Sequence, residues 1–154
     1  MRDQAISETL IEERYTVPAD QTARRLFASL PHGRAYASQL VDAMATGYLV
    51  TVLESVCARA LQPILRQGEE TVVGSRVELQ HRAPAVPGAT LRLWGWVERM
   101  GDRDVTFWIG ADHGDERICE ARVVLHIVSA EAMTARIARK LGRDKAQPCL
   151  ALAA

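Results

Sequence analysis

The sequence has few aromatic residues, no excess charge of either sign and no long apolar run. Aromatic residues make up 5% of the 154 residues, and 19 basic residues balance 19 acidic ones. Without net charge the chain has no general field to attract nucleic acid or an anionic membrane, so we expect neither partner. With 48% hydrophobic residues, it can bury a core without disulfides or metals. We expect one domain over residues 1–141 and a flexible tail over 142–154.

The chain also lacks a cysteine pattern that binds metal or forms disulfides. Cys57, Cys119 and Cys149 contain no CxxC pair, and no histidine completes a zinc site. We therefore expect no metal and a reducing compartment. The N-terminal stretch MRDQAISETLIEERY is acidic where a signal peptide needs an apolar block, and the longest uncharged run, which ends at Glu54, is too short to span a bilayer. We expect a cytoplasmic protein without a membrane segment.

The N-terminal half predicts one strand followed by helices. Even spacing of apolar residues predicts a strand over residues 9–17, which Pro18 ends. Asp20 is a candidate cap for a short helix over 22–30, and a second short helix is expected over 36–44. The main helix then runs from about 45 to 65, unless Pro63 ends it earlier, and Gly68 closes this region.

The C-terminal half predicts four consecutive strands and a final helix. Val77, Leu79 and His81 alternate with polar residues, and residues 91–97 show the same period. The turns MGDRD and DHGDE predict antiparallel strands over 105–111 and 118–127. Ser129 is expected to begin a charged terminal helix. A long apolar helix must be enclosed, so this order predicts an α+β hotdog fold, in which a curved antiparallel sheet wraps around one central helix.

An exposed edge of such a sheet favours pairing between two subunits, which predicts a homodimer.

Within the main helix, Glu54 is the only charged residue between Asp42 and Arg59. A carboxylate buried without partners raises its pKa, by up to about 3–5 units, and is poised to accept a proton. The alternative is that Glu54 lies at a subunit contact and pairs with an arginine such as Arg122.

Three further positions are candidates for site residues. Thr46 can cap the main helix, and Gly47 can let a ligand approach free N–H groups at its positive end. His81 ends an otherwise apolar strand face, and Arg122 interrupts the apolar final strand. Each position also has a purely structural alternative. Thr46 could simply cap the helix beside a closely packed Gly47, and His81 could be a core histidine whose hydrogen bonds are satisfied. Arg122 could form a structural ion pair.

The stretches ATGYLVTVLESVCARAL, GSRVELQHRAPAVPG and ARVVLH resemble the fluoroacetyl-CoA-specific thioesterase family, a branch of the hotdog thioesterases, from about residue 15 to 127. The resemblance implies a catalytic set of Thr46, Glu54 and His81. It also matches Gly74 and Arg122 to two further family positions. Ala37 and Leu40 stand where the family enzyme carries lid phenylalanines, which implies a broader or different small acyl-CoA substrate.

The implied reaction is hydrolysis of a small acyl-CoA thioester to the free acid and CoA, with no cofactor beyond the coenzyme A of the substrate. Glu54 would act as base or nucleophile, His81 would polarise and carry a proton, and Thr46 would orient through its hydroxyl. Backbone near Gly47 or Gly74 would contact the oxyanion. Arg122 would position the acyl end or anchor Glu54.

Other functions remain open from the sequence. Eight residues of helix rise about 12 Å, so Thr46 meets Glu54 only if it precedes the helix or if the substrate bridges them. A non-catalytic acyl-CoA binding or sensor module would use the same cavity. A hotdog hydratase or dehydratase is a further alternative, although His32 and Asp42 do not have its spacing. In a scaffold protein, Glu54 and Arg122 would only hold a dimer together.

Overall fold

The computed structural model describes residues 10–146, with side chains described through Arg143. Five strands form one antiparallel sheet in the order β1-β3-β4-β5-β2. The strands are β1 Leu10–Thr16, β2 Glu70–His81, β3 Thr90–Met100, β4 Asp104–His113 and β5 Glu116–Ser129. The helices are α2 Ala23–Ala28, α3 Thr46–Leu61 and α4 Ala130–Ala146, with short 3-10 turns η1 Gly33–Ala35, η2 Ala37–Gln39 and η3 Gln62–Ile64. No helix in the described range is long and apolar enough to cross a membrane.

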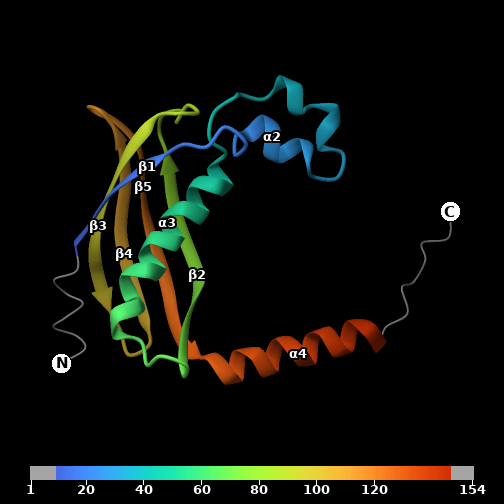
Figure 1. Ribbon diagram of the computed structural model, residues 1–154, viewed down its shortest axis with the longest axis vertical. Coiled ribbons are helices and arrows are strands. Elements are labelled where there is room, and N and C mark those ends of the chain that lie inside the picture. The colour runs from blue at the N-terminus through green and yellow to red at the C-terminus, as the bar shows by residue number, and fades with distance from the viewer. Residues whose placement is uncertain (1–9, 147–154) are drawn as a thin grey trace.

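The sheet curves around α3 because one face of each strand carries the apolar residues (Figure 1). The predicted alternation is present: Leu91, Leu93 and Gly95 of β3 are buried, and the residues between them are more exposed. In β5 the buried residues Cys119, Ala121, Val123, Leu125 and Ile127 alternate with residues that are at least partly exposed. We call the face toward α3 the inner face of the sheet and the opposite face the outer face.

Helix α3 packs on the inner face through six buried residues, Leu49, Val52, Leu53, Val56, Cys57 and Leu61. Its opposite side stays open, because Gly47, Thr51 and Ser55 are exposed. The helix is therefore covered on one side only, less completely than its apolar sequence predicts. At its first turns, the hydroxyls of Tyr48 and Tyr15 lie 2.7 Å apart and tie α3 to β1.

Three local predictions differ from the structure. Thr22 caps α2, since its side chain accepts a hydrogen bond from the Arg25 N–H, and Asp20 is therefore not the cap. The helix expected over 36–44 is replaced by η2 and an extended segment, and Leu40 has extended backbone angles. Pro63 lies in η3, so α3 ends at Leu61 rather than near residue 65, because proline lacks the N–H that an α-helix needs.

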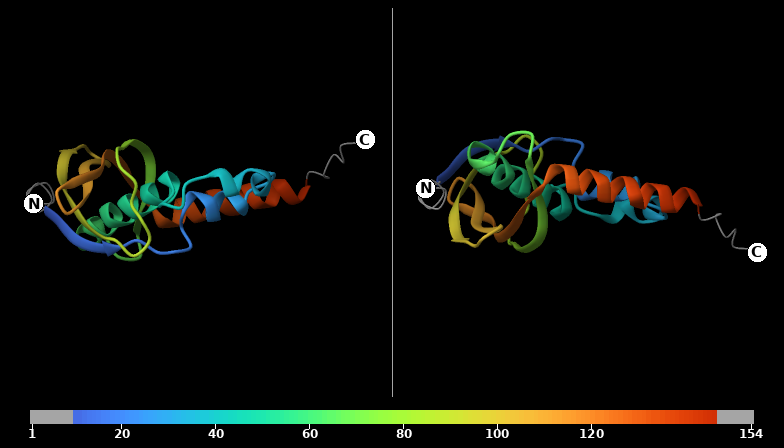
Figure 2. Two further views of the ribbon diagram at one scale, coloured as in Figure 1. Left: turned by 90° about the horizontal axis from the view of Figure 1, so that it is seen from above. Right: turned by 90° about the horizontal axis from the view of Figure 1, so that it is seen from below.

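Two parts of the chain project from the sheet on the same side (Figures 1 and 2). One is the lobe formed by residues 23–41, which contains α2, η1 and η2. The other is α4, which begins after β5; Ser129 caps it by accepting a hydrogen bond from Ala132 N–H at 3.2 Å. This helix continues through Ala146, five residues beyond the expected end of the domain at 141. The remainder of the predicted tail, residues 147–154, lies outside the described range.

Candidate active site at the start of helix α3

Thr46 and His81 form a hydrogen-bonded pair where α3 begins and β2 ends. The Thr46 Oγ1 and His81 Nδ1 atoms lie 2.9 Å apart. The N-cap of α3 is Ala45, with no side-chain cap, so the interpretation of Thr46 as the helix cap is wrong. Its hydroxyl is directed to the histidine instead. Two predicted site residues that are 35 positions apart in the chain are thus brought into contact.

The surroundings of His81 favour its neutral form. Partial burial lowers the pKa of the imidazole, and the backbone of Ala83 opposes this effect in part. A neutral ring that accepts the Thr46 hydroxyl at Nδ1 carries its own proton on Nε2. Within the described residues, this buried Nε2 has no hydrogen-bond partner. The second ring nitrogen of His81 therefore lacks the partner that a fully satisfied core histidine would have.

Glu54 and Gly74 form a second close pair, between the middle of α3 and β2. A Cβ atom added at Gly74 would lie 2.6 Å from Cδ of Glu54, which is a steric overlap. The glycine therefore makes room for the carboxyl group. The Glu54 side chain is half-buried and makes no hydrogen bond or ion pair among residues 10–146. Burial, and secondarily the negative charge of Glu54, raises the pKa of the Cys57 thiol.

A β-bulge brings both pairs to the inner face. Gly74 is opposite Leu125 and Arg76 is opposite Val124, so Ser75 is an extra residue in β2. Successive residues of a strand point to opposite faces, and Gly74 and His81 are seven positions apart. An uninterrupted strand would therefore place them on opposite faces. The extra residue shifts the alternation by one, so both positions face α3.

The two pairs remain separate within one chain. Thr46 is the first residue of α3 and Glu54 lies eight residues further on, a rise of about 12 Å. Thr46 does not precede the helix, which removes one of the two arrangements that would let it meet Glu54. The Glu, Thr and His positions therefore do not form a single cluster in the isolated chain.

A shallow cavity of about 340 Å³ opens at the Thr46–His81 pair. Apolar side chains from the lobe and from the segment before α3 form much of its wall, including Ala23, Phe27, Val41 and Met44. Ala37 and Leu40, the expected substrate-contacting positions, do not line it: Ala37 is buried in η2, and Leu40 binds Arg24 through its carbonyl oxygen. Phe27 was missed because nothing in the sequence relates α2 to Thr46.

Gly47 lies on the open side of this cavity. It is exposed, and a Cβ atom added there would meet nothing within 4 Å. Close packing by the protein therefore does not explain this glycine. The first hydrogen bond within the helix is from Leu49 N–H to the Ala45 carbonyl. The N–H groups of Thr46, Gly47 and Tyr48 consequently have no partner within the helix.

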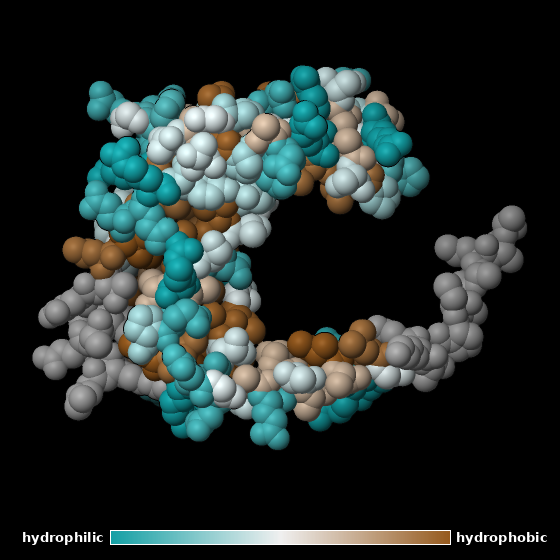
Figure 3. Space-filling view, in the orientation of Figure 1, coloured by the Kyte–Doolittle hydropathy of each residue, from teal (hydrophilic) through white to brown (hydrophobic). Residues whose placement is uncertain are grey.

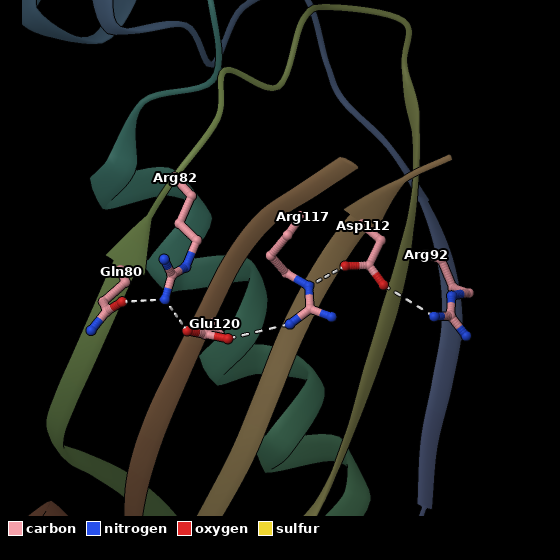
Figure 4. A network of polar contacts seen from close by, with 6 residues as sticks. All are labelled: Gln80, Arg82, Arg92, Asp112, Arg117 and Glu120. Carbon is pink, nitrogen blue, oxygen red and sulfur yellow. Dashed lines mark hydrogen bonds and ion pairs between the residues drawn. The ribbon is translucent and has the colours of Figure 1, made fainter. Parts of the chain in front are cut away.

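Among the described residues, Arg82 is the only charged residue that lines the cavity. Its guanidinium group is bound by other side chains on the outer face of the sheet. Its guanidinium donates to Gln80 Oε1 at 2.6 Å and to Glu120. These contacts begin a chain that continues through Arg117 and Asp112 to Arg92 across the outer face (Figure 4). Apart from Thr46, His81, Arg82 and backbone groups, the described lining of the cavity is apolar.

Arg122 also lies on the outer face, away from Glu54. Its guanidinium donates to both carboxylate oxygens of Glu98 at 2.8–3.0 Å and stacks over the Trp108 ring at 5.1 Å. The proposed contact between Arg122 and Glu54 is therefore absent within one chain. The structural ion pair that was the alternative for Arg122 is present, with Glu98 as its partner.

Neither the largest hollow nor a metal-binding cluster competes with Thr46 and His81 in the described part of the chain. A larger hollow of about 770 Å³ lies near the start of α4, between residues such as Arg66, Arg103 and Glu131, and it contains none of the predicted site residues. Across residues 10–146, no three His, Cys, Asp or Glu side chains gather to hold a metal ion.

Comparison with known proteins gives the family. Residues 32–131 match the fluoroacetyl-CoA-specific thioesterase family. The fluoroacetyl-CoA thioesterase of Streptantibioticus cattleyicolor is 27% identical over 137 residues, which cover 84% of this chain and 93% of that protein. The solved structure of the fluoroacetyl-CoA thioesterase FlK superposes with a TM-score of 0.78 at 24% identity, over 88% of this chain and 96% of that one. A hot-dog-like protein from Thermanaerovibrio acidaminovorans superposes with a TM-score of 0.73 at 18% identity, over 90% and 95% of the two chains. The chain has the hotdog fold, belongs to the fluoroacetyl-CoA-specific thioesterase family and is a thioester hydrolase.

Proposed function

We propose that this protein hydrolyses a small acyl-CoA thioester to the free acid and CoA, with Thr46, His81 and Glu54 as the catalytic residues. The observation that carries the proposal is the Thr46–His81 hydrogen bond at an apolar cavity beside the start of α3. A structure of a related fluoroacetyl-CoA-specific thioesterase holds fluoroacetate and CoA, which supports an acyl-CoA substrate.

The start of α3 supplies the groups that a thioester carbonyl requires. Hydrolysis places negative charge on the carbonyl oxygen, and N–H groups at a helix N-terminus stabilise such charge. The free N–H groups of Gly47 and Tyr48 lie on this first turn. The Thr46 hydroxyl orients the imidazole, and the Nε2–H of His81 polarises the thioester or delivers a proton to the departing thiolate.

Glu54 would act as the base for water or as the nucleophile, and a homodimer would bring it to the Thr46–His81 pair. β2 is an edge strand of the sheet. Two copies related by a two-fold axis pair their β2 strands antiparallel. If that axis crosses midway between Gly74 and His81, His81 of one copy lies beside Gly74 of the other. Glu54 of the second copy then faces the thioester held by the first.

The cavity wall also restricts the acyl group. Among the described lining residues, no cation is free to bind a second carboxylate, because Arg82 is held by Gln80 and Glu120. We therefore expect short uncharged acyl groups to be preferred over dicarboxylic ones. The expected substrate, broader than or different from fluoroacetyl-CoA, now depends on the cavity wall formed by residues such as Phe27 and Val41, because Ala37 and Leu40 do not line the cavity.

Release of free thiol from a panel of acyl-CoAs tests the reaction. The panel contains acetyl-, fluoroacetyl-, butyryl- and succinyl-CoA, with Glu54→Gln and His81→Ala beside the parent. We expect turnover of the uncharged members, with a loss of about 10²-fold or more in kcat for each variant. Binding of acyl-CoA without thiol release would replace the proposal with a binding module. Conversion of an enoyl-CoA without thioester cleavage would replace it with a hydratase.

Mixing two inactive variants tests whether the site is shared. Glu54→Gln and His81→Ala chains are unfolded together and refolded. If each site combines His81 of one chain with Glu54 of the other, a mixed dimer has one site that carries both substitutions and one site that carries neither. The unsubstituted site restores activity. If each site belongs to one chain, the mixture stays inactive. Refolded parent is the control for recovery.

A further inference from the structure

Helix α4 carries an apolar stripe that the rest of its own chain does not cover. Met133, Ile137 and Leu141 recur every four residues and so lie on one side of the helix. Ile137 is 52% exposed and Leu141 is 58% exposed. Figure 3 shows hydrophobic surface along the side of α4 that faces the gap toward the lobe. Arg136, Arg139 and Arg143 are exposed on the other side of the helix.

Helix α4 is anchored to the sheet at its first turn. Its first turn is fixed by the hydrogen bond from Ala130 N–H to the Glu69 carbonyl at 2.8 Å, and beyond that turn it extends away from the sheet (Figures 1 and 2). In proteins most of the stability of a helix comes from packing of its apolar face, and the 17-residue α4 leaves that face largely exposed.

The lobe of residues 23–41 presents a second uncovered apolar surface. Phe27, Leu30, Tyr36 and Val41 are 37%, 53%, 43% and 68% exposed. Phe27 and Val41 also line the cavity at Thr46. In one chain the lobe and α4 lie at opposite ends of the gap (Figure 1), so α4 does not reach the lobe of its own chain.

The sheet register points to a second copy of this chain as the partner of both surfaces. Glu70, the first residue of β2, is opposite Ser129, directly before α4. His81, the last residue of β2, lies at the cavity. Antiparallel pairing of β2 with a second β2 sets the first residues of one strand near the last residues of the other. The α4 helix of one copy therefore begins close to the cavity of the other copy.

We propose that two copies of this chain exchange their α4 helices, so that Met133, Ile137 and Leu141 of each cover the Phe27–Val41 surface of the other. Both apolar surfaces are then removed from water, which favours association. The exchanged helix also closes the open side of the cavity. The closing of the cavity matters for catalysis only if the proposed function is correct, because the proposed function places the acyl group in this cavity.

Cysteine cross-linking tests the exchange independently of activity. The parent for this experiment carries Cys149→Ser, since Cys57 and Cys119 are buried. A chain with Leu30→Cys and Ile137→Cys is oxidised mildly, and we expect a covalent dimer on a denaturing gel. The control chain carries Leu30→Cys and Arg139→Cys, which places the second thiol on the other side of α4, and should give at least tenfold less covalent dimer. Equal cross-linking of both chains, or a parent that is monomeric by light scattering, would overturn the proposal.

A second measurement uses Ile137→Glu with Leu141→Glu against the control Arg139→Glu. We expect the dimer dissociation constant to rise tenfold or more for the apolar pair, because the transfer free energy of two buried side chains is lost, and to change less than threefold for the control. A different result is a monomeric parent in which the Ile137→Cys thiol is protected from thiol reagents. That result would overturn the exchange and show that residues of the same chain, such as 147–154, cover the apolar stripe of α4. If the dimer and the cross-link form but no acyl-CoA is hydrolysed, the exchange stands and the proposed function fails.

Discussion

Gly74 leaves the space that the carboxyl group of Glu54 occupies. The three described atoms nearest to a Cβ atom added at position 74 all belong to that group, and the Cβ atom would overlap them. The end of a glutamate side chain is flexible, so it can move aside without disturbing the packing of α3 on the sheet. The pair therefore allows the position of a single carboxylate to be changed without unfolding the protein.

We expect Gly74→Ala to reduce activity much more than stability. The added methyl group displaces the Glu54 carboxylate, so kcat should fall by about 10²-fold, the scale of losing one acid or base group. The free energy of unfolding should change by less than about 1 kcal/mol. Thiol release and urea denaturation measure the two quantities. In Glu54→Gln, the further Gly74→Ala change should have little additional effect; additive losses would contradict the assignment.

Two substitutions at Thr46 test the role of its hydroxyl group separately from the role of its side-chain shape. Thr46→Val keeps the branched side chain but cannot bind His81 Nδ1, so kcat/KM should fall by about 10²-fold. Thr46→Ser retains the hydroxyl and should stay within about tenfold of the parent. NMR of the His81 ring should show that its Nδ1 partner is lost only in the valine variant. Equal activity of the two variants would exclude a role for the hydrogen bond.

The pH dependence of activity should follow the depressed pKa of His81. Burial lowers this pKa in the folded protein, whereas an unfolded histidine titrates near about 6.5. Protonation removes the acceptor at Nδ1, so kcat/KM should fall on an acidic limb centred below about pH 6.5. The unfolded chain takes up the proton at a higher pH than the folded one, so this residue makes stability decrease as the pH falls below about 6.5. An acidic limb centred above that value would contradict the assignment.

Phe27 should influence which acyl groups are accepted. Its ring lines the cavity from α2, so Phe27→Ala enlarges the space beside the thioester. We expect kcat/KM for hexanoyl-CoA to rise relative to that for acetyl-CoA by about tenfold, since a few methylene groups in an apolar pocket distinguish substrates on that scale. Leu30→Ala is the matched control, because Leu30 is an exposed residue of the same lobe outside the cavity. A similar change in both variants would indicate a general loosening of the lobe.

Asp112 should contribute to stability from the outer face. Burial alone would raise the pKa of its carboxyl group, but hydrogen bonds from Arg117 and Arg92 outweigh this and lower it. Asp112→Ala should cost about 1–2 kcal/mol in urea denaturation. Glu12→Ala removes a highly exposed partner of the same Arg92, 3.9 Å away, and should cost less than about 0.5 kcal/mol. The Asp112 contribution is present above the unfolded pKa of about 3.9 and is lost as the pH falls through the lower folded value.

The strands and the long helix were predictable because their signals are local. Alternation of apolar residues identified all five strands, and Pro63 was recognised as a possible end of α3. The segment before α3 was not predictable in the same way. Residues 36–44 have a composition compatible with a helix, but η2 ends at Gln39 and Met44 N–H donates to the Ala85 carbonyl, a contact that depends on the tertiary fold.

The site was predicted as a set of residues but not as an arrangement. Thr46 and His81 do meet, and Glu54 does lie against Gly74. The bulge at Ser75, which sets both β2 positions on one face, has no signal in the alternation of this strand. The expected contact between Arg122 and Glu54 does not form within one chain, because Arg122 lies on the outer face and binds Glu98.

The chain of ion pairs from Arg82 to Arg92 and the Thr46–His81 pair occupy opposite surfaces of one sheet. Substitutions at Asp112, Arg117 or Arg92, which do not line the cavity, alter resistance to heat or acid without touching the groups that handle substrate. Natural variants of this protein could thus adapt to new temperatures on one surface and to new acyl chains on the other. The two properties would then be free to evolve separately.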